Sequence, residues 1–388
     1  MFHSSYIELS KSALLKNIKF LRNLIGKDVL FSSVIKGNAY GHGIEQFLPL
    51  AEKCGIRHFS VFNADEALNA FSNKTEDSHI SIMGAIDDEE LPWAIENDIS
   101  FYVFEIDRIR QAILSSQKVG KPARIHLELE TGLNRTGLQD QQLDEAVCLI
   151  KNNPRHLQVD GVCTHYAGAE SVNNFLRIQN QIDQFNAQVK WLTDQGINCG
   201  LRHTACSAAA LSYPQTRMDM VRIGIAHYGF WPSQETKMQY ILNGGAAHAK
   251  RDHDPLKRVM TWKSKVMNIK DVDQGEFVGY GTTHLTQQAQ RIAAIPVGYH
   301  HGFARSLSNL GYVLIRGKRA LVVGMVNMHV ILVDVTRIKD IQRGDEVVII
   351  GKQKNAFITV GSFSDLSRFQ NYEVLARLPY NIPRLIVD

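Results

Sequence analysis

The chain has 388 residues, of which 44% are hydrophobic and 21% are charged, so it is long enough for two domains with separate hydrophobic cores. Its net charge of +4 is small for this length and no dense basic tract is present, which argues against a nucleic-acid partner. The N-terminus lacks the apolar segment of a signal peptide and no apolar run could span a bilayer, so we expect a cytoplasmic protein without membrane association.

The first predicted elements are a helix and a buried strand. Apolar residues recur at helical spacing between Leu14 and Ile25, and Ser10 can cap this helix. The apolar run 29–35 predicts a buried parallel strand, which places Lys36 at its carboxyl end. A lysine there is either a solvated charge or a poorly hydrated amine that can form a Schiff base with an aldehyde.

The segment after Lys36 has the composition of a ligand-binding loop. Three glycines, Gly37, Gly41 and Gly43, let the backbone approach a ligand closely. Tyr40 offers a hydroxyl group at short range. Together with the lysine, these residues suit a phosphorylated aldehyde.

Seven further strand-like runs follow, with helical stretches between them. They cover residues 56–62, 79–84, 99–104, 123–130, 157–164, 197–203 and 218–225. Eight strands alternating with helices over about 225 residues predict a TIM-type (β/α)8 barrel for residues 1–242. An open doubly wound sheet is less suitable because no dinucleotide-binding glycine fingerprint is present. In a barrel of this kind, functional residues lie at the carboxyl ends of the strands.

A change of composition marks a second domain. Residues 243–255 are polar and contain glycine, and we interpret them as a linker. Short β-branched runs then predict a mostly β C-terminal domain over residues 256–388, which residues 1–9 are expected to join. These runs cover residues 259–269, 291–297, 320–323, 329–335 and 346–350.

Several polar residues follow the later barrel strands, and each has a structural alternative. Arg135 lies in a glycine-bearing turn. It is either an ordinary surface charge or a guanidinium that binds a phenolate or a carboxylate. His165 could be a satisfied core histidine, and Ser207 could be a helix N-cap. The run 221–225, which contains Arg222, ends the last strand, after which barrels often bind phosphate.

Tyr280 stands out in the C-terminal half. It lies in the glycine-flanked segment 277–283 and, taken alone, reads as an ordinary turn residue. Beside a ligand-binding barrel, its hydroxyl could instead add or remove a proton on the ligand.

The run Val34-Ile35-Lys36-Gly37-Asn38-Ala39-Tyr40-Gly41-His42-Gly43 resembles the pyridoxal-phosphate motif of the alanine racemases, which usually has alanine in place of Gly37. The resemblance implies a fold-type-III amino-acid racemase whose cofactor is pyridoxal 5'-phosphate, held covalently by Lys36, with Tyr40 on the phosphate. It implies further cofactor contacts from Arg135, His165, Ser207, Arg222, Gly224, Ile225 and Tyr380.

The same resemblance implies the catalytic roles. Lys36 would serve the D face and Tyr280 the L face, with His165 and Arg222 as a relay to the tyrosine. Arg135 would contact the cofactor's ring oxygen and the substrate carboxylate. An arginine retains its proton, so Arg222 would hydrogen-bond the pyridine nitrogen without protonating it, which disfavours transamination.

The resemblance also implies a homodimer with a composite active site. In this family one subunit's barrel meets the other's β domain, so Tyr280, Tyr299 and Met328 would come from the partner subunit, the last two as substrate contacts. The expected reaction is the interconversion of L- and D-alanine, which supplies D-alanine for peptidoglycan.

Three residues depart from the family pattern. Glu128 stands where many alanine racemases have a carbamylated lysine that orients the arginine matching Arg135, and we interpret it as a replacement negative charge. His300 and His329 stand where aspartates are common, which leaves substrate identity open. A racemase for serine or a larger amino acid is therefore an alternative.

Other classes of function are less consistent with the sequence. A pyridoxal-phosphate decarboxylase would need an acidic partner for the pyridine nitrogen, and the position is occupied by Arg222. A non-catalytic pyridoxal-phosphate-binding protein would not need the second domain with Tyr280. No histidine or cysteine spacing matches a metal site, so no metal is expected.

Overall fold

The computed structural model of the chain describes residues 3–245, 254–367 and 371–388. The chain divides into two compact units. The barrel unit comprises Ala13–Lys36 and Leu48–Lys257, and the β unit comprises Met1–Ser12, Gly37–Phe47 and Arg258–Asp388. Among the described residues, no helix combines the length and the apolar character needed to cross a membrane.

The barrel unit contains one sheet of eight strands, and all neighbouring strands are parallel. They are β2 (Leu30–Val34), β3 (His58–Val61), β4 (His79–Ile82), β5 (Ser100–Val103), β6 (Ala123–Glu128), β7 (Leu157–Cys163), β8 (Leu201–His203) and β9 (Met220–Ile223). The pairing order is β8-β7-β6-β5-β4-β3-β2-β9. At the seam between β8 and β9, the Asp219 N–H donates to the Arg202 carbonyl at 3.1 Å. The sheet is therefore a nearly closed barrel, which confirms the predicted fold.

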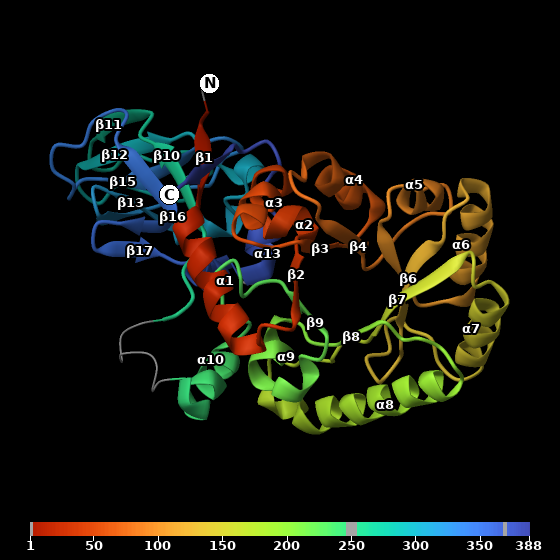
Figure 1. The fold of residues 1–388 in the computed structure, drawn as a ribbon. Coiled ribbons are helices and arrows are strands. Elements are labelled where there is room, and N and C mark those ends of the chain that lie inside the picture. Colours follow the sequence, from red (N-terminus) through yellow and green to blue (C-terminus); the bar gives the residue numbers. More distant parts are fainter. Residues whose placement is uncertain (1–2, 246–253, 368–370) are drawn as a thin grey trace. The chain divides into compact units, whose positions relative to one another are not determined.

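Helices alternate with these strands. They are α1 (Lys11–Ile25), α3 (Ile44–Lys53), α4 (Ala64–Asn73), α5 (Leu91–Glu96), α6 (Ile106–Val119), α7 (Gln141–Asn152), α8 (Phe175–Asp194), α9 (Ser207–Ser212) and α10 (Gln234–Tyr240). Figure 1 shows α4 to α8 around the outside of the barrel strands. Their local sequences fit these positions: Asn63 caps α4 by accepting from the Glu66 N–H, and α6 ends at Gly120 in the left-handed conformation.

Polar side chains lie inside the barrel beside the usual aliphatic ones. The strands β3, β5 and β9 are buried along their whole length, as is typical of parallel strands covered on both faces. The Ser32 and Ser60 hydroxyls are 2.7 Å apart, and His58 Nδ1 lies 2.9 Å from the Ser32 hydroxyl. Hydrogen bonding compensates the burial of these groups.

The described residues of the β unit form two sheets, two short α-helices near the C-terminus, and two 3₁₀-helices, Tyr299–His301 and Arg305–Leu307. The larger sheet has the order β14-β13-β16-β10-β1-β18, with β17 paired to β16, and the smaller has the order β11-β12-β15. The strands are β1 (Ser5–Ser10), β10 (Met260–Lys265), β11 (Asn268–Val272), β12 (Gln290–Ile295), β13 (Tyr312–Ile315), β14 (Lys318–Leu321), β15 (Ile331–Asp334), β16 (Glu346–Gln353), β17 (Ala356–Ile358) and β18 (Arg384–Val387), and the helices are α12 (Val360–Ser367) and α13 (Asn371–Ala376). The C-terminal half is thus mostly β, as predicted.

Within this unit, each of the five predicted β-branched runs contains observed strand residues, whereas β13, β17 and β18 were not predicted. The N-terminal strand β1 pairs antiparallel with β10 and parallel with β18. Of the predicted linker at 243–255, residues 246–253 lie outside the described residues. The segment Ile241–Gly245 before them is a π-helix.

Candidate active site

Lys36 follows β2 directly, so its backbone lies at the carboxyl end of a barrel strand as predicted. The side chain is solvent-exposed, and within the described residues its amine has no hydrogen bond or ion pair. Although part of the side chain reaches solvent, the protein around it removes some of its hydration and so lowers the pKa of Lys36, and the positive charge of Arg135 lowers it further. The neutral amine is therefore more accessible than in an ordinary surface lysine.

A left-handed turn follows Lys36. Four successive residues have positive φ angles: 62° at Gly37, 52° at Asn38, 53° at Ala39 and 50° at Tyr40. Only glycine adopts this conformation without cost, so local hydrogen bonds must hold the turn. The Gly43 N–H donates to the Asn38 carbonyl at 2.9 Å, and the Asn38 side chain accepts from the Ile44 N–H at 3.0 Å.

Arg384 ties this turn to the C-terminal segment of the β unit. Its guanidinium, which is only 7% exposed, donates to the Gly41 carbonyl at 2.9 Å and to the Tyr380 carbonyl at 2.9 Å. Further bonds reach Pro379 and Ile382. Sequence reasoning did not identify Arg384 as a positioning residue, although it follows the family-like segment that begins at Tyr380.

Two tyrosines predicted to contact the cofactor lie in this part of the β unit: Tyr40, predicted at the phosphate, and Tyr380. The Tyr40 ring packs against Tyr372 with 6.1 Å between the ring centroids. Tyr380 is 70% exposed, and its backbone is held by Arg384. Arg384 therefore fixes the backbone around both tyrosines.

Arg222 occupies the centre of the barrel's carboxyl end. It is 5% exposed, and its Nη2 group donates to the Thr164 carbonyl at 2.7 Å. Nη1 donates to the carbonyl and to Nδ1 of His203, both at 2.6 Å. Within the described residues, no carboxylate lies at ion-pair distance from this guanidinium. Arg222 is therefore a buried cation held by neutral acceptors.

His165 and Arg135 lie in the electrostatic field of the same site. Burial lowers the pKa of His165 to about 3, and the positive charges of Arg222, Arg135 and Lys36 contribute to this lowering. The histidine is therefore neutral at physiological pH. The structure shows no hydrogen bond between the side chains of His165 and Arg222 within the described residues, so the predicted relay has no direct contact in the single chain.

Glu128 is buried at the end of β6, where it accepts from the Thr136 hydroxyl at 3.1 Å with both carboxylate oxygens. Burial raises the pKa of Glu128, whereas the nearby positive charge of Arg135 lowers it. No ion pair joins the two side chains in the described part of the chain. The influence of Glu128 on Arg135 is therefore electrostatic and acts without contact.

Ser207 and the segment after β9 form a group of donors. The Ser207 hydroxyl accepts from the Gly224 N–H at 2.9 Å and from the Ala226 N–H at 3.4 Å. Among the described residues, neither the Ser207 hydroxyl hydrogen nor the Ile225 N–H has an acceptor. Both residues are buried, so these unpaired donors suit an anion such as phosphate.

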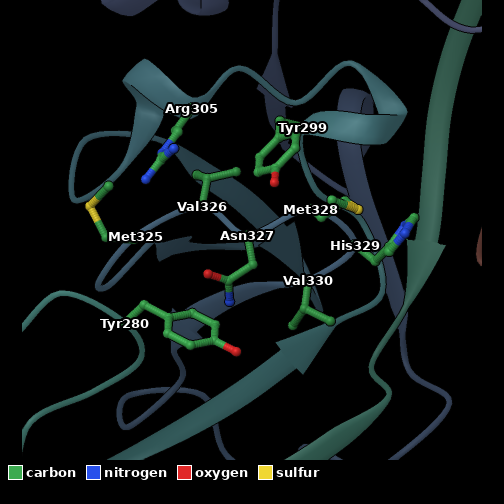
Figure 2. Close-up of a pocket in the computed structure, with 9 residues that line it drawn as sticks. All are labelled: Tyr280, Tyr299, Arg305, Met325, Val326, Asn327, Met328, His329 and Val330. Atoms are coloured by element: carbon green, nitrogen blue, oxygen red, sulfur yellow. The ribbon is translucent and has the colours of Figure 1, made fainter.

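A pocket of about 440 Å³ lies in the β unit. It is lined by Tyr280, Tyr299, Arg305, Met325, Val326, Asn327, Met328, His329 and Val330. Figure 2 shows Tyr280 and Tyr299 on opposite sides of Asn327. Tyr280 is 75% exposed and the flanking Gly279 and Gly281 have φ angles of 78° and 77°, so the turn presents its ring to the solvent. The three residues expected from the partner subunit thus share one pocket.

Three histidines cluster beside this pocket. The ring centroids of His300 and His329 are 4.9 Å apart, and those of His301 and His329 are 5.5 Å apart. Burial and the neighbouring imidazoles lower the pKa of His301. Sequence reasoning identified only His300 and His329, although the adjacent His301 was visible. In the described part of the chain, no group of three or more potential ligands is placed to hold a metal ion.

The sequence-predicted site residues thus fall into two sets. The barrel unit holds Lys36, Arg135, His165, Ser207, Arg222, Gly224 and Ile225, and the β unit holds Tyr40, Tyr280, Tyr299, Met328 and Tyr380. The barrel set contains the positively charged side chains and the hydrogen-bond donors that have no acceptor among the described residues. The second supplies tyrosine hydroxyls and an open pocket.

Known protein families match both parts of the chain. The family described as "Alanine racemase, N-terminal domain" matches residues 9–232, and "Alanine racemase, C-terminal domain" matches residues 259–386. An alanine racemase from Leptospira interrogans is 33% identical over 390 aligned positions, covering 100% of this chain and 96% of the relative.

Solved structures give the same result. The alanine racemase of Clostridium difficile 630 superposes with a TM-score of 0.90 at 28% identity, covering 100% of this chain and 96% of the other. The alanine racemase of Bacillus anthracis with bound L-Ala-P has a TM-score of 0.88 at 28% identity, with the same coverage of both chains.

Proposed function

The chain belongs to the alanine racemase family of amino-acid racemases, and from this premise we propose that it uses pyridoxal 5'-phosphate to interconvert L- and D-alanine. One observation supports this proposal most strongly. The carboxyl end of the barrel brings together an amine of lowered pKa, Lys36, and a buried guanidinium, Arg222, that contacts no carboxylate among the described residues.

The groups present fit pyridoxal phosphate. Lys36 has an amine that can bind its aldehyde, and the unpaired donors of Ser207 and Ile225 suit its phosphate. Arg222 offers a donor to the pyridine nitrogen, and Tyr40 and Tyr380 would contact the phosphate. When bound, the cofactor supplies an electron-withdrawing ring that stabilises negative charge left on the substrate's Cα.

Each candidate catalytic residue has a distinct role in this proposal. Lys36 removes or returns the Cα proton on one face, and the Tyr280 hydroxyl does so on the other. The guanidinium of Arg135 binds the substrate carboxylate. His165, which is neutral, and Arg222, which is positively charged, would form the relay to Tyr280. Arg222 keeps its proton throughout and so does not protonate the pyridine nitrogen. The cofactor ring would therefore withdraw less negative charge from the substrate's Cα.

The proposed assembly is a homodimer in which each active site combines two subunits. Tyr280, Tyr299 and Met328 are all more than two-fifths exposed in the single chain, although they line one pocket. Aromatic and apolar side chains exposed together mark surfaces that a partner covers. The product D-alanine would serve peptidoglycan synthesis.

The histidine cluster favours a second candidate, a racemase of the same mechanism that prefers serine or a larger amino acid. His300, His301 and His329 lie together beside the pocket lined by Tyr280. Charge at this place affects which substrate side chains can approach the pocket. Decarboxylation is disfavoured because Arg222, rather than a carboxylate, is available for the pyridine nitrogen.

The test is turnover by the purified, pyridoxal-phosphate-loaded protein of a panel of L-amino acids, with products separated on a chiral column. We expect alanine to have the highest kcat/KM. A higher value for serine or a larger amino acid would establish the second candidate, and release of carbon dioxide without inversion would refute both.

A further inference from the structure

Two buried histidines continue the hydrogen-bond network of Arg222 into the barrel interior. Arg222 Nη1 donates to His203 Nδ1 at 2.6 Å, and His203 Nε2 lies 2.9 Å from His126 Nδ1. His203 ends β8 and His126 lies within β6, so the chain of contacts runs from Arg222 in β9 across one side of the barrel, past β7. His203 is 0% exposed and His126 is 1% exposed. The proposed function gives His126 no role.

Arg222 determines which nitrogen of each ring carries hydrogen. An arginine side chain has donors only, so His203 Nδ1 must present its lone pair. Burial lowers the pKa of His126 to about 3 and that of His203 well below its usual value, with the Arg222 charge contributing in both cases. Both rings are therefore neutral. His203 then carries hydrogen on Nε2 and donates it to His126 Nδ1, which leaves the hydrogen of His126 on Nε2.

The far end of this chain is unsatisfied. His126 Nε2 has no hydrogen-bond partner within the described residues, and the nearby Tyr102 hydroxyl also lacks one. The Tyr102 ring centroid lies 5.6 Å from that of His126. A buried donor without an acceptor is unfavourable, and an aliphatic side chain would fill the space without this cost. Packing alone therefore does not account for a histidine at position 126.

The backbone is shaped to admit this ring. Ile125 pairs with Val159 and His126 with Gly161, so Asp160 is an extra residue of β7 and forms a bulge. A Cβ atom at Gly161 would lie 2.5 Å from the Leu201 carbonyl oxygen and 2.6 Å from His126 Nδ1, so glycine is required by the neighbouring backbone as well as by the imidazole. Bulges change the direction of side chains beside functional sites. The bulge and the glycine both accommodate His126.

We propose that His126 is a positioning residue that acts through His203 to hold the Arg222 guanidinium in the orientation that meets the pyridine nitrogen of the cofactor. The inference rests on the proposed function, because it concerns the same cofactor. The lone pair on His126 Nδ1 accepts the Nε2 hydrogen of His203 and so stabilises the form of His203 that accepts from Arg222. Without that acceptor, the buried His203 Nε2–H has no partner, so the ring is held less firmly in the position that receives the Arg222 donor.

The test compares His126→Leu with His126→Asn. Leucine removes the acceptor, whereas the asparagine Oδ1 can take the place of Nδ1 and accept from His203. We expect His126→Leu to raise the Kd for pyridoxal phosphate about tenfold, in titrations of the apoprotein followed by cofactor absorbance. It should shift the absorbance band of the bound cofactor and lower kcat, with KM unchanged because Arg222 does not touch the substrate. His126→Asn should restore the Kd and kcat to within about twofold of the unmodified protein and return the absorbance band to its original position.

His58→Leu is the matched control. His58 is also a buried barrel histidine, but its hydrogen bond goes to Ser32 rather than to the Arg222 chain. His58→Leu should lower the thermal stability about as much as His126→Leu does, but it should leave the cofactor Kd and the absorbance of the bound cofactor unchanged. Equal cofactor Kd values for His126→Leu and the unmodified protein would overturn the proposal. If the unmodified protein failed to bind pyridoxal phosphate, the proposed function itself would fail, which is a different result.

A second measurement needs no variant. In ¹⁵N-histidine-labelled protein, the NMR signals of His126 and His203 should be those of neutral rings with hydrogen on Nε2 between pH 5 and pH 8. Hydrogen on Nδ1 of either ring would contradict the deduced direction of the chain, even if His126→Leu did not fold.

Discussion

At the scale of single residues, the site depends on charges that are close but not paired. Glu128 is buried and bonded to the Thr136 hydroxyl, while Arg135 is exposed without an ion-pair partner in the described residues. Lys36 likewise has no carboxylate partner there. Unpaired cations remain available to a carboxylate or phosphate ligand, because no internal contact has to be broken before binding.

The first prediction concerns Glu128→Gln. The folded-state pKa of Glu128 is raised above its unfolded value, so ionisation costs stability as pH rises through the folded pKa. Glutamine removes this cost, so the substituted protein should be at least as stable as the unmodified protein at pH 7 and should lose its advantage at low pH. KM for alanine should rise because Arg135 loses the negative charge that we interpret as orienting its guanidinium for the substrate carboxylate.

Urea unfolding at several pH values and steady-state kinetics measure these effects. A Glu128→Gln protein with unchanged KM, and with Arg135 unmoved in its structure, would show that Glu128 does not replace the carbamate. Thr136→Val is the control, because it removes the hydroxyl contact but keeps the charge.

The second prediction concerns the left-handed turn. At Gly37 an added Cβ would lie 3.8 Å from the Ala376 Cβ, so Gly37→Ala should cost only the conformational penalty of about 1–2 kcal/mol. At Gly41 an added Cβ would overlap the Leu375 carbonyl oxygen, which is backbone and cannot move aside. Gly41→Ala should therefore cost clearly more in the free energy of unfolding. Equal costs would contradict this account of the turn.

Sequence reasoning found individual residues where a strand end or a motif marked them. Lys36, Arg222 and Tyr280 were identified in this way. Arg384 and His126 were missed because their partners are distant in sequence: Arg384 binds the Gly41 carbonyl and His126 binds His203. A lone arginine or histidine in a sequence does not reveal which buried acceptor it meets.

At the scale of elements, Arg384 in β18 stabilises the turn after Lys36. The third prediction is that Arg384→Met lowers the free energy of unfolding by about 2–4 kcal/mol, because several buried carbonyls lose a charged donor. It should also weaken pyridoxal-phosphate binding, since Tyr40 and Tyr380 lose their common support. Arg384→Lys should rescue little, because an ammonium cannot reproduce the planar set of donors.

Chemical denaturation and cofactor titration measure both effects. Arg291→Met is the control, because its ion pair with Asp271 is exposed and should contribute less than about 1 kcal/mol. Comparable losses for Arg384→Met and Arg291→Met would contradict a clamping role for Arg384.

The elements were predictable to different extents. Most barrel strands were recognised because they are largely buried, mainly apolar runs between helices, which is a local pattern, although β8 is short and only its His203 is buried. The strands β13, β17 and β18 were missed because they are short and are defined by partners elsewhere in the chain. The sharp left-handed turn was not foreseen either, since three of its residues are not glycine.

At the scale of the whole molecule, the proposal requires two copies of the chain. The fourth prediction is complementation between Lys36→Met and Tyr280→Phe proteins, each nearly inactive alone. If each site combines the barrel of one subunit with the β unit of the other, a mixed dimer contains one intact site. Dissociation and random reassociation should then restore about a quarter of the unmodified activity.

No restoration, with mixed dimers verified by native mass spectrometry, would mean that each site lies within one chain or that the two residues do not cooperate. This property could not be predicted from the pattern of residues, because a composite site depends on the partner's position. Only the resemblance to the racemases implied it.

The most direct test of the two-base racemase is the reaction of L-alanine in deuterated water with the pyridoxal-phosphate-loaded protein. The account predicts D-alanine with deuterium at Cα from the first turnovers, while the remaining L-alanine acquires little, because separate groups serve the two faces. Tyr280→Phe should suppress inversion. D-alanine that retains the original Cα hydrogen would contradict the two-base mechanism, and absence of both exchange and inversion with every amino acid would refute the racemase.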